Sequence, residues 1–234
     1  MLVDIIIPCF NPGKELIDAL YSCKNQTYSN YRITLVDDAS TSNVQRLIRD
    51  FEDINYIRSD ENLGPSGARN LGIKNTEGDL ISFLDSDDIM DKNKLKFSIK
   101  VLRDNSKVGM VCGNYQIIKD RSRIKKPFYT NPIRVNHSVL MRQNFVASGS
   151  VTVRRSVLDD VGLFDEKLWI AEDYDLWLRI SERYDIGYIH KVLYYYSVVS
   201  GGSSLTQRED IQKDHDANIA KIREASRKRV DKNV

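Results

Sequence analysis

Residues 80–88 read Leu-Ile-Ser-Phe-Leu-Asp-Ser-Asp-Asp, and this stretch is the most informative in the sequence. The apolar run at 80–84 predicts a buried strand, and the acidic run after it predicts a turn, with Asp91 as a plausible cap of the next helix. In open α/β sheets, ligands bind beyond the carboxyl ends of the strands, where Asp85 and Asp87 fall. Their hard carboxylate oxygens suit Mg²⁺ or Mn²⁺. A lone acidic turn is more often only a helix cap, so its neighbours decide its meaning.

The same pattern, a strand that runs into a polar turn, occurs twice upstream. The strand expected at residues 3–8 runs into Phe10 and Asn11, and the strand expected at 32–36 runs into Asp38. Three strand ends would then meet at one rim of the sheet. There an aromatic ring could stack on a nucleobase while a carboxylate accepts a base N–H. Taken singly, Phe10 would be a core residue and Asp38 a cap.

Two further segments offer chemistry of their own. Arg69 lies in Gly-Pro-Ser-Gly-Ala-Arg-Asn, residues 64–70, where small residues begin a helix whose free N–H groups favour phosphate. A tight turn packed on the sheet would explain that segment equally. Glu172 and Asp173 open a later helix and offer a carboxylate able to take a proton from an attacking hydroxyl. The helix dipole alone would also favour acids there.

Short apolar runs alternate with amphipathic segments along the chain, and this alternation predicts an α/β fold with a central, mostly parallel sheet flanked by helices. We expect one catalytic domain over residues 1–205, in which 1–118 bind the nucleotide and 119–205 face the acceptor, followed by a polar, basic helix and tail over 206–234. The expected strands are 3–8, 32–36, 55–58, 80–84, 110–118, 151–154, 186–189 and 193–199; the expected helices include 15–25, 44–51, 91–103, 156–161 and 210–229.

Composition excludes some partners and compartments. Lys and Arg number 35 against 33 Asp and Glu, and a net charge of +2 gives no reason to expect nucleic acid as a partner. Three cysteines cannot all pair with one another, which favours a reducing compartment. The start of the chain lacks the basic region of a signal peptide, so we expect a cytoplasmic protein. Its C-terminal basic residues could also hold it peripherally on the inner face of the membrane, although a solvated face explains them too; they are Lys221, Arg223, Arg227, Lys228 and Arg229.

Five ordered motifs together resemble a family 2 glycosyltransferase of the GT-A fold. They read Ile-Ile-Pro-Cys-Phe-Asn, Val-Asp-Asp-Ala-Ser, Asn-Leu-Gly-Pro-Ser-Gly-Ala-Arg-Asn-Leu-Gly-Ile, Phe-Leu-Asp-Ser-Asp-Asp and Glu-Asp-Tyr-Asp-Leu-Trp-Leu-Arg, and the resemblance spans residues 3–204. Each motif is weak alone, whereas five in order are specific. The resemblance implies transfer of a sugar, of the hexosyl or N-acetylhexosaminyl class, from a nucleotide-diphospho-sugar such as a UDP-sugar to a hydroxyl of a glycan or lipid-linked glycan, in surface polysaccharide or glycan synthesis.

On the nucleotide side, the resemblance implies that Pro8 and Phe10 hold the nucleobase, with Asp38 as its polar partner. Asn11 would also belong to the nucleotide site, and Arg69 would lie near the diphosphate.

On the transfer side, the resemblance implies that Asp87 binds Mn²⁺ or Mg²⁺ directly and that Asp85 approaches the ribose or the metal. Asp173 would be the general base of an inverting, single-displacement transfer. Glu172 and Trp177 would shape the acceptor side, and Asp88 would begin the next helix.

One stretch departs from the family pattern. Many relatives carry an Arg and a His after the last core strand, where this chain has Ser197 and Val199, and neither replacement can bind metal or phosphate as those residues do. The metal would then have fewer protein ligands, with donor phosphates and water completing its shell. The departure also leaves open the alternative that the protein is a non-catalytic module, which binds a sugar-nucleotide or a partner but has lost turnover.

Two other enzyme classes would use a similar set of residues. A nucleotidyltransferase would also join a nucleotide, a metal and a sugar, but it would carry a Gly-rich loop ending in Arg after the first strand, which residues 11–14 lack. A phosphatase would carry Thr where Ile89 stands. The transferred sugar, the acceptor and the linkage depend on loops near residues 119–147 and 163–172.

Overall fold

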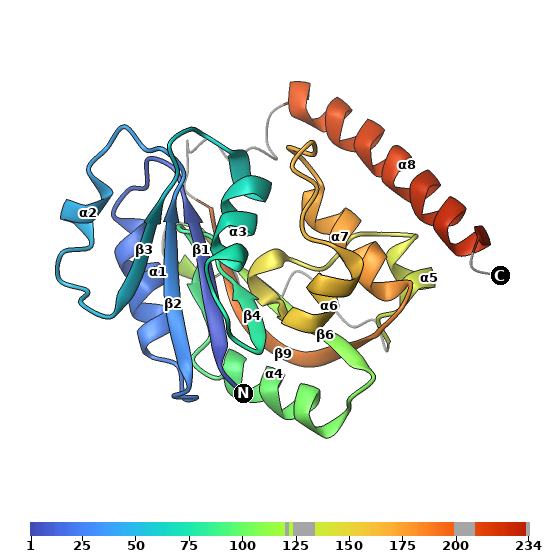
Figure 1. The fold of residues 1–234 in the computed structure, drawn as a ribbon, viewed down its shortest axis with the longest axis horizontal. Coiled ribbons are helices and arrows are strands. Elements are labelled where there is room, and N and C mark those ends of the chain that lie inside the picture. Colours follow the sequence, from blue (N-terminus) through green and yellow to red (C-terminus); the bar gives the residue numbers. More distant parts are fainter. Residues whose placement is uncertain (120–121, 124–133, 199–208, 233–234) are drawn as a thin grey trace.

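The computed structural model describes residues 1–119, 122–123, 134–198 and 209–232. Its sheet begins with four parallel strands in the order β3 (Ile54–Arg58), β2 (Tyr31–Asp37), β1 (Val3–Cys9) and β4 (Leu80–Phe83). Their parallel direction brings the carboxyl ends of all four to the same edge (Figure 1). This edge carries the acidic turns predicted from the sequence.

Beyond β4 the sheet becomes mixed. The next strands across the sheet are β8 (Thr152–Arg154), β6 (Val108–Lys119), β9 (Asp185–Val198) and β5 (Ile89–Met90), and β7 (Ser122–Arg123) pairs with the end of β6. Here β8 runs antiparallel to both β4 and β6, β6 and β9 are parallel, and β5 is antiparallel to β9. The parallel arrangement expected from the sequence therefore describes the nucleotide-side half of the sheet.

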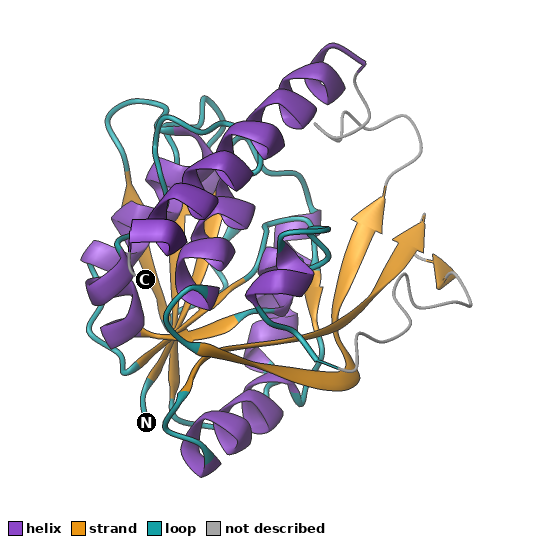
Figure 2. Cartoon of the chain, turned by 90° about the vertical axis from the view of Figure 1, so that its right-hand side faces the viewer, coloured by secondary structure: helices purple, strands orange, loops and turns teal. Residues whose placement is uncertain are grey.

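Helices cover both faces of this sheet, because successive side chains of β1 point alternately into two apolar cores. Ile6 packs into one core with Ala68 and Trp177, whereas Ile5 and Ile7 pack into the other, beneath the first and fourth helices. The two layers are visible on either side of the strands in Figures 1 and 2. The helices are α1 (Glu15–Lys24), α2 (Val44–Leu47), α3 (Gly64–Lys74), α4 (Lys94–Asp104), α5 (His137–Leu140), α6 (Arg155–Val161), α7 (Glu172–Ser181) and α8 (Glu209–Lys232), with one 3₁₀ turn, η1 (Ser148–Ser150).

Two of the expected elements are built differently in the structure. The helix expected over 44–51 ends at Leu47, and the following residues turn so that Ile48 and Phe51 still reach the core. The two late strands expected at 186–189 and 193–199 form one strand, β9. Its pairing with β6 passes from Ile189 directly to Val192. His190 and Lys191, which lie between them, therefore form a β-bulge within one continuous strand.

The C-terminal helix α8 lies along the outer side of α7 (Figures 1 and 2). Ile222 is buried in this contact, and Glu182 of the α7 end accepts hydrogen bonds from Ser226 and Arg229. Arg223 donates to Tyr174 Oη on α7. Two of the five basic residues expected to be available to a membrane, Arg223 and Arg229, therefore face the body of the protein. No helix in the described part of the chain is long and apolar enough to cross a bilayer.

Candidate active site

Strained backbone marks the rim at the carboxyl ends of the strands. Asn11, Ala39 and Ala171 have φ angles of 46°, 55° and 64°, in the left-handed region that residues other than glycine rarely adopt. The first two follow β1 and β2, and Ala171 precedes α7. Such conformations cost on the order of 1–3 kcal/mol each and concentrate at functional sites. The backbone thus points to the same rim as the acidic motifs.

Asn11 joins the ends of the first two strands. Its backbone N–H donates to Ser40 Oγ at 2.8 Å, and its Oδ1 accepts from the N–H groups of Thr41 and Ser42 at 2.8 and 3.2 Å. These bonds fix the turn after β2 against the turn after β1. Phe10 beside it is 52% exposed, which leaves its ring open to a ligand. Pro8 is partly buried below the rim.

The adjacent carboxylates Asp37 and Asp38 have separate surroundings. Asp37 is fully buried, and it accepts hydrogen bonds from Tyr56, Arg58 and the backbone N–H of Ser40. Burial alone would raise the pKa of Asp37, but these hydrogen bonds lower it below its usual value. Asp37 is therefore a structural anchor between β2 and β3, a role that the sequence did not reveal.

Asp38 fixes the entry to α3. Its two carboxylate oxygens accept from the backbone N–H groups of Leu63, at 2.8 Å, and Gly64, at 2.9 Å, and Ser59 Oγ lies 3.2 Å from Oδ1. Asp38 therefore does not cap the helix that follows it, α2, whose N-cap is Asn43, but holds the start of α3 through tertiary hydrogen bonds. A nucleobase N–H would have to share an oxygen that already accepts a hydrogen bond, so contact between Asp38 and the base stays a prediction.

Polar residues of α3 hold the segment that leads into α7. Ser66 Oγ donates to the carbonyl of Leu168 at 3.0 Å, and Asn70 Nδ2 donates to the carbonyl of Phe164 at 2.9 Å. The Gly-Pro-Ser-Gly-Ala-Arg-Asn motif thus positions residues 164–172 as well as starting a helix.

Arg69 connects α3 with the acidic turn after β4 and with the start of α7. It is almost fully buried, and its Nη2 lies 2.8 Å from Asp85 Oδ1 while its Nη1 lies 2.8 Å from Glu172 Oε1. One guanidinium therefore links the acidic turn after β4 with the first turn of α7. Both terminal nitrogens are already paired with carboxylates, so Arg69 positions Asp85 and Glu172, and its contact with a diphosphate stays a prediction.

The acidic turn after β4 divides its carboxylates between surface and core. Asp87 is exposed, yet desolvation in the turn, and then the charges of Asp85 and Glu15, raise its pKa to about 6. Asp88 is buried and accepts hydrogen bonds from Tyr194 Oη and from the backbone N–H of Ser197. The expectation that Asp88 begins the next helix is wrong, because the carboxylate instead ties this turn to β9.

Asp173 has the surroundings of a proton acceptor. Its carboxylate is partly buried at the start of α7, 3.2 Å from Ser148 Oγ and 3.4 Å from Asn144 Nδ2. Burial, followed by the charge of Glu172, raises its pKa to about 7, while Arg69 lowers it in part. A carboxylate with a pKa near neutrality is suited to general base catalysis, because about half of it is ionised near pH 7 and the ionised form binds a proton more strongly than an ordinary carboxylate does.

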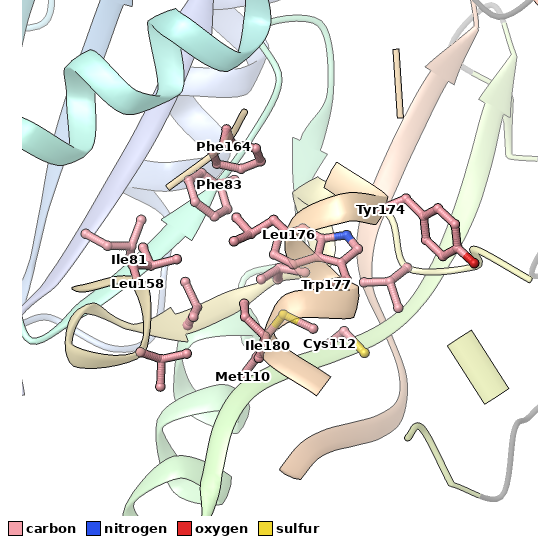
Figure 3. Close-up of a cluster of buried hydrophobic side chains, with 14 of the residues drawn as sticks. Ile81, Phe83, Met110, Cys112, Leu158, Phe164, Tyr174, Leu176, Trp177 and Ile180 are labelled. Atoms are coloured by element: carbon pink, nitrogen blue, oxygen red, sulfur yellow. The ribbon is translucent and has the colours of Figure 1, made fainter. Parts of the chain in front are cut away.

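Trp177 does not face the acceptor side. Its side chain is 0% exposed and packs in the core beneath the site, with ring centroids 6.2 Å from Phe164 and 6.5 Å from Phe83 (Figure 3). The expectation that it shapes the acceptor site directly is corrected. It lies one helical turn after Asp173, on the face of α7 that packs against the sheet.

A buried lysine supports the site from below. Lys94 is 0% exposed, and its Nζ donates to the carbonyls of Phe83, at 3.0 Å, and Gly149, at 2.6 Å. It joins the end of β4 to the η1 turn that presents Ser148 to Asp173. No residue pattern indicated this role, because a lysine near a helix start normally faces solvent.

The residues present fit a divalent cation shared with a substrate. No cluster of three or more His, Cys, Asp or Glu side chains able to hold a metal occurs in the described residues. Asp85 and Asp87 supply two carboxylates, and a cation would offset the charge repulsion that adds to desolvation in raising the pKa of Asp87. Mg²⁺ often binds through one or two carboxylates together with substrate phosphates and water. Val199, at the His position of the family pattern, lies outside the described residues.

A cavity of about 1090 Å³ opens beside Asp87, between α1, β5 and the end of β9. Its wall carries four carboxylates and one lysine among its lining residues, which include Glu15, Asp18, Asp91 and Lys92. Such a wall attracts cations and repels a free diphosphate.

Comparison with known proteins agrees with this geometry. The model of the family described as Glycosyl transferase family 2 matches residues 4–162. WfgD of Escherichia coli, a UDP-Glc:alpha-D-GlcNAc-diphosphoundecaprenol beta-1,3-glucosyltransferase, is 31% identical over 191 residues, covering 81% of this chain and 73% of WfgD. An uncharacterized glycosyltransferase of Rickettsia prowazekii is 32% identical over 199 residues, covering 82% of this chain and 62% of that protein.

Solved structures show the same fold. The crystal structure of Staphylococcus aureus TarS superposes with a TM-score of 0.71 at 23% identity, covering 85% of this chain and 37% of TarS. A shorter form of TarS, residues 1–349, in complex with UDP-GlcNAc also gives a TM-score of 0.71, at 22% identity, covering 85% of this chain and 59% of that form. The expected α/β fold of the GT-A type is confirmed.

The family match decides against the nucleotidyltransferase and phosphatase alternatives, because it covers the acidic turn, the strand ends and the α3 motif together. With that match and WfgD at 31% identity, the chain belongs to glycosyl transferase family 2 and is a glycosyltransferase.

Proposed function

We propose that this glycosyltransferase moves a hexose or N-acetylhexosamine from a UDP-sugar to a hydroxyl of a lipid-linked glycan, with inversion at the anomeric carbon. The donor and acceptor classes are supported by the name of WfgD, which transfers glucose from UDP-Glc to a GlcNAc-diphosphoundecaprenol. A second relative, WfaP of Escherichia coli, carries the same description at 30% identity over 78% of this chain.

The environment of Asp173 is the observation that carries the mechanism. Its pKa of about 7 and its place at the start of α7 suit a general base that takes the proton of the acceptor hydroxyl. The hydroxyl oxygen then attacks the anomeric carbon from the face opposite the diphosphate, in a single displacement that inverts the configuration. Ser148 and Asn144 orient the carboxylate for this step.

Asp87 and Asp85 would hold the divalent cation on the donor side. Bound Mn²⁺ or Mg²⁺ would neutralise charge on the diphosphate leaving group. The Arg69 bridge keeps Asp85 in place relative to Glu172 and hence to the base. The acidic wall of the neighbouring cavity supports a role for a cation, since a diphosphate would otherwise be repelled there.

At the nucleotide end, the exposed ring of Phe10 would stack on the uracil, above Pro8 and beside Asp38. Asn11 holds the two loops that frame this end.

A thermal-shift screen tests the function directly. Nucleoside-diphospho-sugars are added with and without Mn²⁺, and we expect a UDP-sugar with Mn²⁺ to raise the Tm more than either alone. A Tm unchanged by every UDP-sugar tried would contradict the proposed donor. The anomeric configuration of the product, read by NMR, tests inversion separately.

Peripheral membrane contact would bring the enzyme to a lipid-linked acceptor. Lys221, Arg227 and Lys228 are exposed on α8 and could meet anionic headgroups, although Lys228 also pairs with Glu224 at 2.6 Å. We expect the protein to float with vesicles rich in phosphatidylglycerol at low salt. Reversal of these three charges should abolish flotation, and equal flotation with uncharged phosphatidylcholine vesicles would contradict an electrostatic contact.

A further inference from the structure

Trp169 is a large apolar side chain that the fold leaves open to solvent. It is 61% exposed, whereas the other tryptophan of the chain, Trp177, is 0% exposed. A single exposed aromatic residue is common on protein surfaces and needs no special role by itself. The position of Trp169 and the way in which its backbone is held distinguish it.

The backbone on both sides of Trp169 is tied to helices. The carbonyl of Leu168 accepts from Ser66 Oγ of α3 at 3.0 Å, and the carbonyl of Ile170 accepts from Asn218 Nδ2 of α8 at 3.4 Å. The indole is thus presented from a fixed segment. A side chain that is held in place and exposed can bind a partner with little loss of conformational entropy.

The indole rests on the backbone of Gly64, at the nucleotide-side rim. A Cβ placed on Gly64 would lie 3.3 Å from Cζ3 and 3.4 Å from Cη2 of Trp169. The N–H of Gly64 donates to Asp38. Three residues after Trp169, Glu172 begins the turn that carries Asp173. Trp169 therefore stands between the predicted nucleotide end and the predicted base.

We propose that Trp169 is a carbohydrate-binding platform, on whose indole face a pyranose ring of the substrate packs during transfer; this inference rests on the proposed function. A pyranose presents a face of C–H groups with positive partial charge, and an aromatic ring presents a negative face. Contact between the two faces buries apolar surface of both groups, while the sugar hydroxyls stay at the edge. The ring can belong to the donor or to the acceptor.

Fluorescence quenching by iodide tests the contact without relying on activity. Because Trp177 is fully buried, the quenchable emission belongs to Trp169, and a Trp169→Phe variant serves as the blank. UDP with Mn²⁺ should leave the quenching unchanged. Protection by UDP-glucose or UDP-N-acetylglucosamine would place the donor sugar on the indole; protection by an N-acetylglucosaminyl diphosphate with a short alkyl chain, added with UDP, would place the acceptor sugar there.

Two results of that experiment overturn the platform. Unchanged quenching by all sugar ligands, when a Tm shift shows that they bind, would mean that no pyranose covers Trp169. Equal protection by UDP alone would mean that the nucleotide covers it. The absence of any Tm shift would instead overturn the proposed function, and the platform with it.

Kinetics of matched variants give a second test. Trp169→Ala should raise the KM of the sugar that packs on the indole by roughly 3- to 10-fold with little change in kcat, since a contact present in the ground state and the transition state affects binding alone. Trp169→Phe should recover part of that loss. Lys167→Ala, an exposed neighbour on the same segment, is the control and should keep both constants. An unchanged KM for both sugars in Trp169→Ala would contradict the platform.

Discussion

Arg69 Nη1 lies 2.8 Å from Glu172 Oε1, and this ion pair connects residues 103 positions apart in the sequence. The same guanidinium holds Asp85 of the acidic turn. The predicted metal ligands and the predicted base are thus connected through the buried Arg69 guanidinium. Displacement of the Asp85 or the Glu172 carboxylate would therefore affect the other.

Replacement of Arg69 should destabilise the fold. Arg69→Met leaves two carboxylates without their partner, and we expect a loss of about 3 kcal/mol in the free energy of unfolding, measured by urea denaturation. Arg69→Lys keeps the charge but cannot bind both carboxylates through a planar fork, so its loss should be smaller. Equal stability of Arg69→Met and the parent protein would show that the bridge contributes nothing.

The rate of transfer should depend on the ionisation of Asp173. Because the base acts when deprotonated and its pKa is about 7, kcat/KM should rise with pH through about 7 and then level off. Asp173→Asn should reduce kcat by roughly 10²- to 10⁴-fold while donor binding, followed by thermal shift, stays nearly unchanged. Normal turnover in this variant would exclude Asp173 as the base.

The same carboxylate should weaken the fold at high pH. Its pKa is raised from 3.8 to about 7 on folding, so the folded state keeps a proton that the unfolded state releases between these values. The stability that Asp173 contributes is therefore full at low pH and is lost as the pH rises to about 7. Relative to the parent protein, Asp173→Asn should be more stable at about pH 8 than at about pH 4.5. A stability difference independent of pH would contradict the raised pKa.

Asp87 should control metal-dependent binding of the donor. Asp87→Ala removes the exposed carboxylate of the turn, and titration calorimetry with UDP and Mn²⁺ should then show loss of the Mn²⁺-dependent part of the affinity. Asp18→Ala is a matched control, since Asp18 lines the same cavity from α1 but is not proposed to bind the metal directly. If Asp87→Ala binds UDP and Mn²⁺ as the parent does, Asp87 is not a metal ligand.

Lys94 should make stability depend on pH in the alkaline range. Burial lowers its pKa from 10.5 to about 7, so between these values the unfolded state binds a proton that the folded state releases. Stability contributed by Lys94 therefore rises as the pH increases from about 7 toward 10. The difference in unfolding free energy between the parent and Lys94→Met should follow this rise. A constant difference over that range would show that the ammonium stays charged between its two carbonyl partners.

The residue pattern predicted the elements that packing and local chemistry both favour. Strand β4 and the acidic turn after it could be read directly, because an apolar run followed by aspartates is typical of a strand that ends at the ligand-binding edge of an α/β sheet. The start of α7 was equally readable from its acidic first turn and its apolar face. The sequence prediction divided β9 into two strands at His190 and Lys191. In the structure these polar residues lie in a bulge, and backbone pairing with β6 on both sides of the bulge keeps the strand continuous.

By itself, the sequence indicated the family through five ordered motifs. Local periodicity and the direction of parallel strands predicted the order of the βα units and the rim that carries Asp85 and Asp87, whereas the role of Asp173 was predicted from the family resemblance. Only the tertiary structure decided which polar groups support that rim. It buried Trp177, paired Arg69 with two carboxylates and placed Lys94 beneath β4. Such contacts join residues far apart in the chain, and burial sets their pKa values, so neither follows from the spacing of residues along the sequence.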